Sequence, residues 1–198
     1  MITAAGHDRR RAEILCGALD VFIKEGFADT TFQKISDRCG ITRTTLYVYF
    51  RNKKEIFSYS IKQLLAKAEG DILLARQRTD GGSIEKITVV LADIFRQLEE
   101  NRRLLHVVLD YILYFSRSGL DASACVRRRT VRLRHILSSL VIPGIKSGEI
   151  KNMEAKAAGN FLYGFIEAAI FRLAVLRQES VGELKETAVA AVRALGQK

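Results

Sequence analysis

The sequence contains no tryptophan and only one proline, Pro143, among 198 residues. Sandwiches and barrels of short strands are usually punctuated by proline and glycine turns. This chain is instead rich in Ala, Leu, Ile, Arg, Lys and Glu, most of which favour helices. The scarcity of proline and the abundance of helix-forming residues predict an all-α fold.

Cysteine and histidine are also scarce, with three residues of each type. Cys16, Cys39 and Cys125 are far apart and lack the Cys/His spacing of a metal site, so we expect reduced structural thiols. On one helix, Cys125 and His135 would lie about 15 Å apart, too far for a catalytic dyad. No glycine-rich phosphate loop is present in the sequence. We therefore expect no enzyme activity, no metal and no cofactor.

Long apolar runs are missing as well. The longest one, Phe161 to Leu176, contains Glu167 and Arg172 and is shorter than the roughly 20 residues that a transmembrane helix needs. The N-terminal sequence MITAAGHDRRRAEIL has no apolar core ahead of its charges, unlike a secretory signal. We therefore expect a cytoplasmic protein without a membrane partner.

Positive charge exceeds negative charge, with 32 Lys and Arg residues against 22 Asp and Glu residues and a net charge of +10. Such an excess indicates an anionic partner, which is a nucleic acid, a membrane surface or an acidic protein. Half of the excess lies between Thr31 and Lys54, where six cations accompany the single anion Asp37. The six cations are Lys34, Arg38, Arg43, Arg51, Lys53 and Lys54.

Two short helices separated by a glycine turn are expected within this basic segment. Thr31 is a cap signal for a helix from Phe32 to Cys39. Gly40 then supplies the positive φ of a sharp turn, and Thr42 caps a further helix that starts at Arg43. This order is the helix-turn-helix arrangement, whose second helix enters the major groove of DNA.

The remaining residues show helical periodicity too. We expect a helix-turn-helix DNA-binding domain over residues 1–52 and a helical regulatory and dimerisation domain over residues 53–198. The other expected helices are Arg9 to Gly26, Asn52 to Thr79, Ile84 to Asn101, Arg103 to Ser116, Asp121 to Pro143, Glu154 to Arg177 and Val181 to Leu195. The helix over 103–116 is apolar almost all round, which predicts burial on every side. PGIKSGEI, which begins at Pro143, is expected to be a loop.

Glu154 to Arg177 is apolar over about two thirds of its circumference, more than the core of one chain usually covers. Gly159 and Gly164 each cost a helix about 1 kcal/mol, so they favour a close approach of two backbones. We therefore expect a homodimer in which the last two helices of each chain form a four-helix bundle. A monomer with a tightly packed core is the alternative.

The expected DNA contacts are of two kinds. Arg43 and Thr44 lie on the first turn of the helix that would enter the groove, where arginine can bind guanine O6 and N7 and threonine can contact several bases. The side chains expected to bind phosphates are Thr31, Thr42, Thr45, Tyr47, Tyr49 and Lys53. Leu46 and Phe50 are expected to face inward. A solvated basic helix is the alternative interpretation.

The run TFQKISDRCGITRTTLYVYFRNKKEIF, from Thr31 to Phe57, resembles the signature of the TetR family of bacterial transcriptional regulators. That signature has a threonine start, then Ile-Ala-x-x-Ala-Gly-Val-Ser, Leu-Tyr-x-Tyr-Phe and Asn/Ser-Lys-Glu. Cys39 replaces the usual alanine, and Thr44 stands where glycine, alanine or proline is common. The resemblance implies a dimeric repressor that binds palindromic half-sites in double-stranded DNA and releases them when its C-terminal body takes up a small-molecule effector.

Polar residues within apolar helices are the expected effector contacts: His106, Asp110, Tyr111, Tyr114, Tyr163 and Glu167. The alternative is that they are structural pairs and core aromatics. Arg127 to His135 is basic and indicates a solvated face, a second nucleic-acid site or a site for an acidic ligand. Arg9, Arg10 and Arg11 either reach a flanking phosphate or minor groove or form an exposed tail.

A second function stays open on the sequence alone. An architectural DNA-binding protein without an inducer would share the basic motif but would prefer no particular DNA sequence. Competition with random duplexes separates the two functions.

Overall fold

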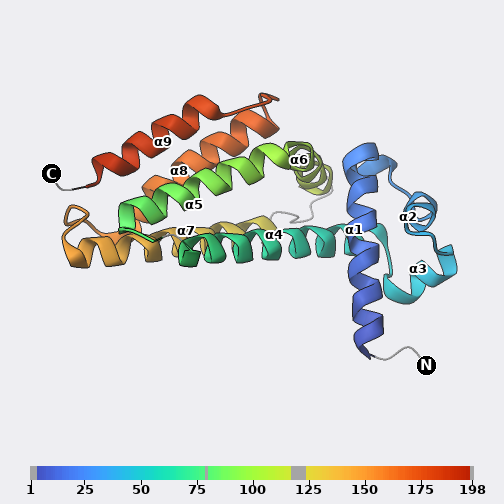
Figure 1. Cartoon of the computed structure of the whole chain (residues 1–198). Helices are drawn as coiled ribbons and strands as arrows, with labels where there is room; N and C mark the ends of the chain where they lie inside the picture. The colour runs from blue at the N-terminus through green and yellow to red at the C-terminus, as the bar shows by residue number, and fades with distance from the viewer. Residues whose placement is uncertain (1–3, 79, 117–123, 197–198) are drawn as a thin grey trace. The chain divides into compact units, whose positions relative to one another are not determined.

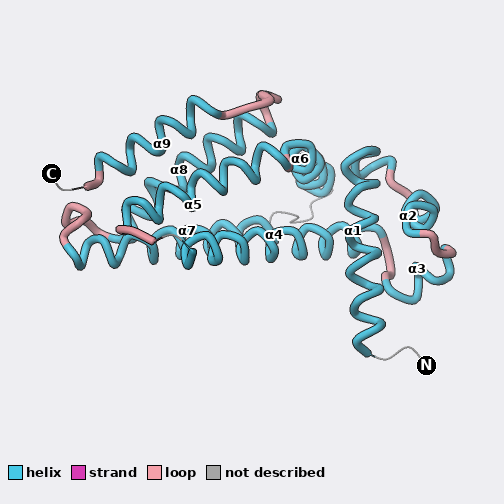
Figure 2. The backbone as a smooth tube through the Cα atoms, viewed as in Figure 1, coloured by secondary structure: helices cyan, strands magenta, loops and turns pink. Residues whose placement is uncertain are grey.

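The computed structural model describes residues 4–78, 80–116 and 124–196. The helices are α1 (Ala4–Asp29), α2 (Phe32–Cys39), α3 (Arg43–Tyr49), α4 (Lys53–Arg78), α5 (Ser83–Glu100), α6 (Arg102–Ser116), α7 (Ala124–Ser147), α8 (Ala155–Ala174) and α9 (Gly182–Ala194) (Figure 1). Within the described residues no strand is present (Figure 2), and Ile150 and Gly196 form an isolated antiparallel bridge. The expected all-α fold is confirmed.

The chain forms two compact units. The first comprises Met1–Ala66 and Val107–Cys125, and the second comprises Lys67–His106 and Val126–Lys198. Helices α4 and α6 therefore each contribute residues to both units, whereas the sequence placed a single boundary after residue 52.

Aromatic packing accounts for the composition of the first unit. The Phe57 ring of α4 lies 4.9 Å from that of Phe22 and 4.5 Å from that of Tyr111, which belongs to α6. Tyr111 also lies 4.8 Å from Phe27. Phe22, Phe27 and Phe57 are buried, so the start of α4 and the end of α6 complete the core beneath the helix-turn-helix.

Helix α1 begins at Ala4, earlier than the expected Arg9, and bends near its end. Gly26 has φ of 79°, a conformation that only glycine adopts readily. The Thr30 hydroxyl donates to the Gly26 carbonyl oxygen at 2.6 Å and closes the bend. The expected stop at Gly26 is thus a kink, and helical residues continue to Asp29.

The second unit packs α5, α8 and α9 against one another around buried aliphatic side chains. Two carboxylates cap helix starts from a distance in the sequence. Glu149 accepts hydrogen bonds from the backbone nitrogens of Ser83 at 2.6 Å and Ile84 at 3.0 Å. Glu99 accepts one from Val181 N at 2.7 Å. Both caps leave fewer unpaired N–H groups at the helix ends.

The break expected at Pro143 is wrong, because α7 continues through it to Ser147. Proline removes one helical hydrogen bond, but packing on both sides outweighs that loss. Leu140 and Val141 are buried before it. Gly144 follows so close to Ile150 that an added methyl group would come within 2.6 Å of Ile150 Cδ1.

Helix α6 is not buried on every side, since Leu113 is 48% and Tyr114 54% exposed, while Leu104, Val107 and Tyr111 form its buried face. The expected cap Asp121 lies outside the described residues.

Among the described helices, none has the length and hydropathy needed to cross a membrane.

Candidate nucleic-acid interface

Caps and a left-handed glycine build the helix-turn-helix. Thr31 Oγ1 accepts a hydrogen bond from Lys34 N at 3.2 Å at the start of α2. Gly40, with φ of 62°, ends that helix. Thr42 Oγ1 accepts one from Thr45 N at 3.1 Å and begins α3. The expected bounds of α2 and the expected start of α3 are confirmed.

Three of the residues expected to bind phosphates have a structural role as well. Thr31 and Thr42 cap helices, and Thr45 contacts the cap Thr42. The hydroxyl oxygens of Thr42 and Thr45 lie 2.9 Å apart. Thr31 and Thr42 are exposed, and Thr45 is half-buried. These contacts fix the hydroxyls at the starts of α2 and α3, where unpaired backbone N–H groups also attract anions.

Helix α3 presents most of its surface outward. Leu46 is fully buried, together with Phe50 just beyond the helix, as expected. Arg43, Thr44 and Tyr47 are exposed. The two residues expected to read bases thus lie on the open side of the helix.

Each tyrosine of α3 stacks on a ring from another helix. Tyr47 stacks on Phe32 of α2, with centroids 4.5 Å apart and planes at 25°. Tyr49 stacks on His7 of α1, with centroids 4.6 Å apart and planes at 26°. Neither Phe32 nor His7 was singled out from the sequence, because both contacts depend on how the helices cross.

The expected phosphate contact of Lys53 conflicts with its position. Its ammonium donates to the carbonyl oxygens of Phe27 at 2.9 Å, Ala28 at 2.7 Å and Thr30 at 3.0 Å. An ammonium group has three protons, so these carbonyls occupy all of them. Burial lowers the pKa of Lys53, and Asp29 partly offsets this. Lys53 ties the start of α4 to the end of α1.

Most other cations of the basic segment also have partners within the first unit. Lys34 binds Glu25 at 2.7 Å and Arg38 binds Asp20 at 2.5 Å. The Lys54 ammonium lies 4.6 Å from the centre of the Phe115 ring. Arg43 and Arg51 differ, because neither side chain makes a hydrogen bond or ion pair with another described residue. These two arginines carry the charge that is free to meet an anion.

The arginines near the N-terminus belong to α1 and do not precede it. Arg9 and Arg10 pair with Glu13 at 3.2 Å and 2.9 Å. These pairs lower the pKa of Glu13, with Arg10 the larger cause. The Arg11 guanidinium lies 4.2 Å from the centre of the Tyr59 ring. Arg9 is exposed, whereas Arg10 and Arg11 are half-buried. A flanking DNA contact would therefore come from arginines on a helix and not from a tail.

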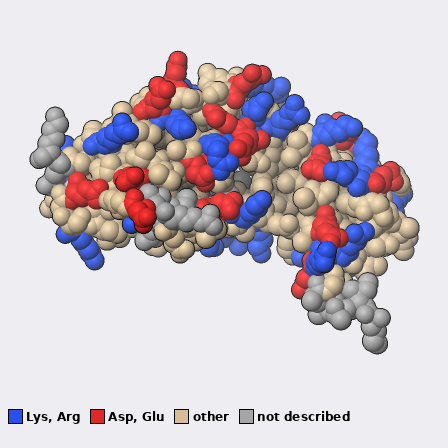
Figure 3. Space-filling model, viewed as in Figure 1, with Lys and Arg blue, Asp and Glu red and all other residues tan. Residues whose placement is uncertain are grey.

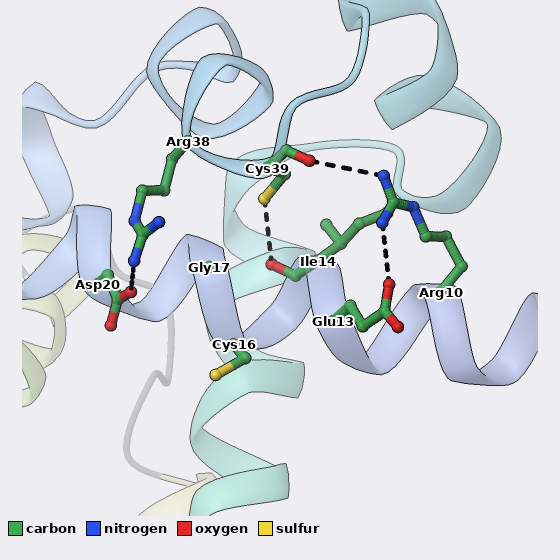
Figure 4. Close-up of a pocket in the computed structure, with 8 residues that line it drawn as sticks. All are labelled: Arg10, Glu13, Ile14, Cys16, Gly17, Asp20, Arg38 and Cys39. Carbon is green, nitrogen blue, oxygen red and sulfur yellow. Dashed lines mark hydrogen bonds and ion pairs between the residues drawn. The ribbon is translucent and has the colours of Figure 1, made fainter.

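A shallow groove lies between α1 and α2 (Figure 4). The Cys39 thiol donates to the Ile14 carbonyl oxygen at 3.7 Å, and burial raises the pKa of this thiol. Cys16 is exposed, and its side chain points away from the Cys39 thiol. Arg10 and Arg38 are each paired with a carboxylate across or beside the groove. No cluster suited to a metal ion occurs among the described residues.

The structure does not bring the six expected effector contacts together within either unit. His106 Nε2 lies 2.7 Å from Leu173 O, and the Tyr163 hydroxyl lies 3.1 Å from Thr130 Oγ1. Tyr111 belongs to the aromatic core of the first unit. The other three, Asp110, Tyr114 and Glu167, are exposed.

The basic stretch of α7 is largely exposed, but two of its arginines are held within the second unit. Arg132 forms an ion pair with Glu69 at 2.9 Å. The Arg134 guanidinium lies 5.0 Å from the centre of the Tyr163 ring. Basic and acidic side chains are interspersed on the face shown in Figure 3. Neither Glu69 nor Thr130 carries a local sequence signal that would have identified it.

Helix α8 divides its apolar residues between two faces. Ala158, Leu162, Ala169 and Leu173 are buried within the chain. An outward stripe remains uncovered, and its members are Ala157, Phe161, Gly164, Phe171, Val175 and Leu176. The helix therefore carries more apolar surface than the chain itself covers, as the sequence pattern predicted.

The two glycines of α8 lie on different faces. A methyl group on Gly159 would overlap Ser138 Oγ and come within 2.9 Å of Ser138 N, so Gly159 allows α7 of the same chain to approach. Gly164 has nothing within 4 Å of the corresponding position and faces outward. The close approach expected of Gly159 is thus explained within one chain.

Comparisons with known proteins agree with this geometry. Residues 14–59 match the family profile of bacterial regulatory proteins of the tetR family. The fatty acid metabolism regulator protein of Bacillus subtilis (strain 168) is 25% identical over 163 residues, which cover 80% of each chain. The HTH-type transcriptional regulator SrpR of Pseudomonas putida is 23% identical over 85% of this chain and 77% of its own.

A solved structure shares the fold across both units. A TetR transcription regulator from Haloarcula marismortui ATCC 43049 has a TM-score of 0.79 at 20% identity, covering 96% of this chain and 97% of its own. The profile match covers the helix-turn-helix, and the relatives that extend over most of the chain are transcriptional regulators and not enzymes. Residues 14–59 therefore form a helix-turn-helix domain of the tetR-family type, and the chain is similar over most of its length to regulators that carry this domain.

Proposed function

We propose that the chain is a homodimeric repressor that binds a palindromic operator and leaves it when a small-molecule effector binds. The observation that carries the DNA part is the open face of α3, where Arg43, Thr44 and Tyr47 are exposed on a helix fixed by the Thr42 cap. A recognition helix must present such side chains to the groove. A DNA partner also supports a cytoplasmic location.

Within this proposal the residues have distinct roles. Arg43 and Thr44 read base edges. Arg51, which has no side-chain partner among the described residues, joins Tyr47, Tyr49 and the capped threonines Thr31, Thr42 and Thr45 at the phosphates. Lys53 supports the domain from within.

The outward stripe of α8 supports the dimer. Its exposed large side chains include Phe161 at 46%, Phe171 at 53% and Leu176 at 55%. A contiguous apolar stripe on a helix favours burial against a partner, and Gly164 lets a second backbone come close. A dimer would present two α3 helices to half-sites about one helical turn of DNA apart, roughly 34 Å.

Effector control rests on the helices that belong to both units. Helix α4 contributes Lys53–Ala66 to the first unit and its later residues to the second. An effector releases DNA only if it prefers the non-binding form, and a preference of a few kcal/mol is enough. The Bacillus subtilis relative is a fatty acid metabolism regulator, so fatty acids are the first metabolites to test.

Selection of bound duplexes from fragments of the source genome tests the DNA proposal. We expect recovery of palindromic sites that outcompete random duplexes by at least a hundredfold at physiological salt. Equal affinity for random duplexes would instead support an architectural DNA-binding protein. Addition of fatty acids to the selected complex then tests release, and repetition with other metabolite classes widens the search.

A further inference from the structure

The centre of the open face of α3 is occupied by Thr44 and Val48. Leu46 is the buried residue of this seven-residue helix. Successive residues of an α-helix are 100° apart, so residues two before and two after Leu46 point almost directly away from it. Thr44 and Val48 therefore lie one turn apart along the middle of the exposed side, with Arg43 and Tyr47 on one flank.

Val48 is an exception on this face because its side chain is apolar and 71% exposed, the most exposed large hydrophobic residue described. It contributes nothing to the core of the first unit. Valine is also a weaker helix former than alanine, since the helix restricts its branched side chain. Folding of the described residues gives no reason for valine here, whereas contact with a partner would.

The major groove contains one apolar group that distinguishes bases, the C5-methyl group of thymine. We propose that Val48 contacts this methyl group and thereby sets a preference for thymine at one position of each half-site. This inference rests on the proposed operator binding and adds a specificity-determining residue to it. A valine neither donates nor accepts a hydrogen bond, so it would leave the polar edges of other bases unpaired.

The position of the thymine relative to the other contact follows from helix geometry. Four residues of α-helix rise about 6 Å, and successive base pairs are about 3.4 Å apart. The thymine met by Val48 should therefore lie one or two base pairs from the base met by Thr44. Both contacts then fall within one half-site.

The experiment replaces each thymine of a selected operator, one at a time, by deoxyuridine. This change removes the methyl group and keeps every hydrogen-bonding atom of the base. For the wild-type protein we expect about a fourfold loss of affinity at one position of a half-site, the effect of one buried methyl group. Substitution at the matching positions of both half-sites should multiply the loss to about sixteenfold.

Variants assign the effect to Val48. Val48→Ala, whose side chain is shorter, should lose most of the discrimination between the thymine and deoxyuridine operators at that position, whereas Val48→Ile, which keeps a branched apolar side chain, should still discriminate. Because Val48 is exposed, thermal unfolding of both variants should match the wild type, which shows that they fold.

Two results would overturn the inference. If Val48→Ala keeps the wild-type loss at every position while the wild type binds its operator selectively, the methyl contact belongs to another residue and the regulator function stands. If the wild type binds no duplex selectively, both the inference and the proposed function fail.

Discussion

The rings of Phe32 and Tyr47 lie nearly parallel with their centroids 4.5 Å apart, which joins the first residue of α2 to the exposed side of α3. Tyr47 is 54% exposed despite this contact. The stack therefore restricts the side chain while leaving about half of the residue exposed. A preorganised side chain loses less conformational entropy when it binds.

Phe32→Ala should consequently weaken operator binding about fivefold, because an aromatic pair contributes on the order of 1 kcal/mol. Phe32→Tyr keeps the ring and should bind like the wild type. Titration of a labelled operator measures both. The double variant with Tyr47→Ala should be no weaker than Tyr47→Ala alone, and additive losses would show that Phe32 acts independently of Tyr47.

Replacement of Lys53 by methionine should affect folding more than DNA electrostatics. The variant leaves the carbonyl oxygens of Phe27, Ala28 and Thr30 without their cationic donor. We expect the free energy of unfolding to fall by about 1 to 3 kcal/mol, as for hydrogen bonds to a charged group. Denaturant unfolding measures this loss.

The salt dependence of DNA binding distinguishes this structural role from a phosphate contact. The slope of log affinity against log salt should be unchanged in Lys53→Met, because no phosphate contact is removed. Lys54→Met is the matched control at the adjacent position, and it should lower stability less. If Lys53→Met instead has normal stability and a slope smaller by about one, Lys53 binds a phosphate.

Gly17 and Cys39 should show strong coupling. A methyl group on Gly17 would come within 2.8 Å of Cys39 Sγ. Gly17→Ala should therefore destabilise the wild-type background despite the better helix propensity of alanine. In a Cys39→Ala background the space is free, and the same change should stabilise by up to about 1 kcal/mol. Equal effects in the two backgrounds, measured by thermal unfolding, would contradict this packing.

The two glycines of α8 should respond differently to substitution. Gly164→Leu should leave the folded monomer intact but weaken dimerisation at least tenfold in sedimentation equilibrium, because it fills the outward face. Gly159→Ala is the control for packing inside the chain. Its clash with Ser138 should lower unfolding stability by about 1 to 3 kcal/mol. A fully dimeric Gly164→Leu protein would place the dimer contact elsewhere.

The ion pair between Glu25 and Lys34 predicts acid sensitivity of the α1–α2 packing. The hydrogen bond that the Glu25 carboxylate accepts from Lys34 is the main cause that lowers the pKa of Glu25 below 4.5. A lowered carboxyl pKa contributes stability above about pH 4.5, and that contribution is lost as pH falls through the folded-state pKa. Glu25→Gln should flatten the acid limb of a stability-against-pH curve, and an unchanged limb would assign it to other carboxylates.

Local signals made the helix-turn-helix predictable from the sequence. Thr31, Gly40 and Thr42 act on backbone atoms within a few residues, so their identities determine where α2 ends and where α2 and α3 begin. The apolar residues of α8 similarly predicted that this helix has more apolar surface than one chain covers.

Such local signals could not predict contacts between segments that are far apart in the sequence. Pro143 was expected to break α7, but the packing of Gly144 against Ile150 depends on tertiary structure. Lys53 fits the basic pattern of a DNA contact, and only the nearby end of α1 reveals its carbonyl partners. The effector candidates were chosen as polar residues on apolar helices, a pattern that structural hydrogen bonds such as His106 to Leu173 also produce.

The aromatic core shared by Phe22, Phe27, Phe57 and Tyr111 has a consequence for protein engineering. A fragment cut after residue 52 would lack two of these rings and would expose the other two to water. Transplanting the DNA specificity onto a different sensor body therefore requires residues 53–66 and 107–116 as well, or equivalent rings from the recipient. The exchangeable cassette is discontinuous in the gene, and a chimera designed at a single crossover point should aggregate.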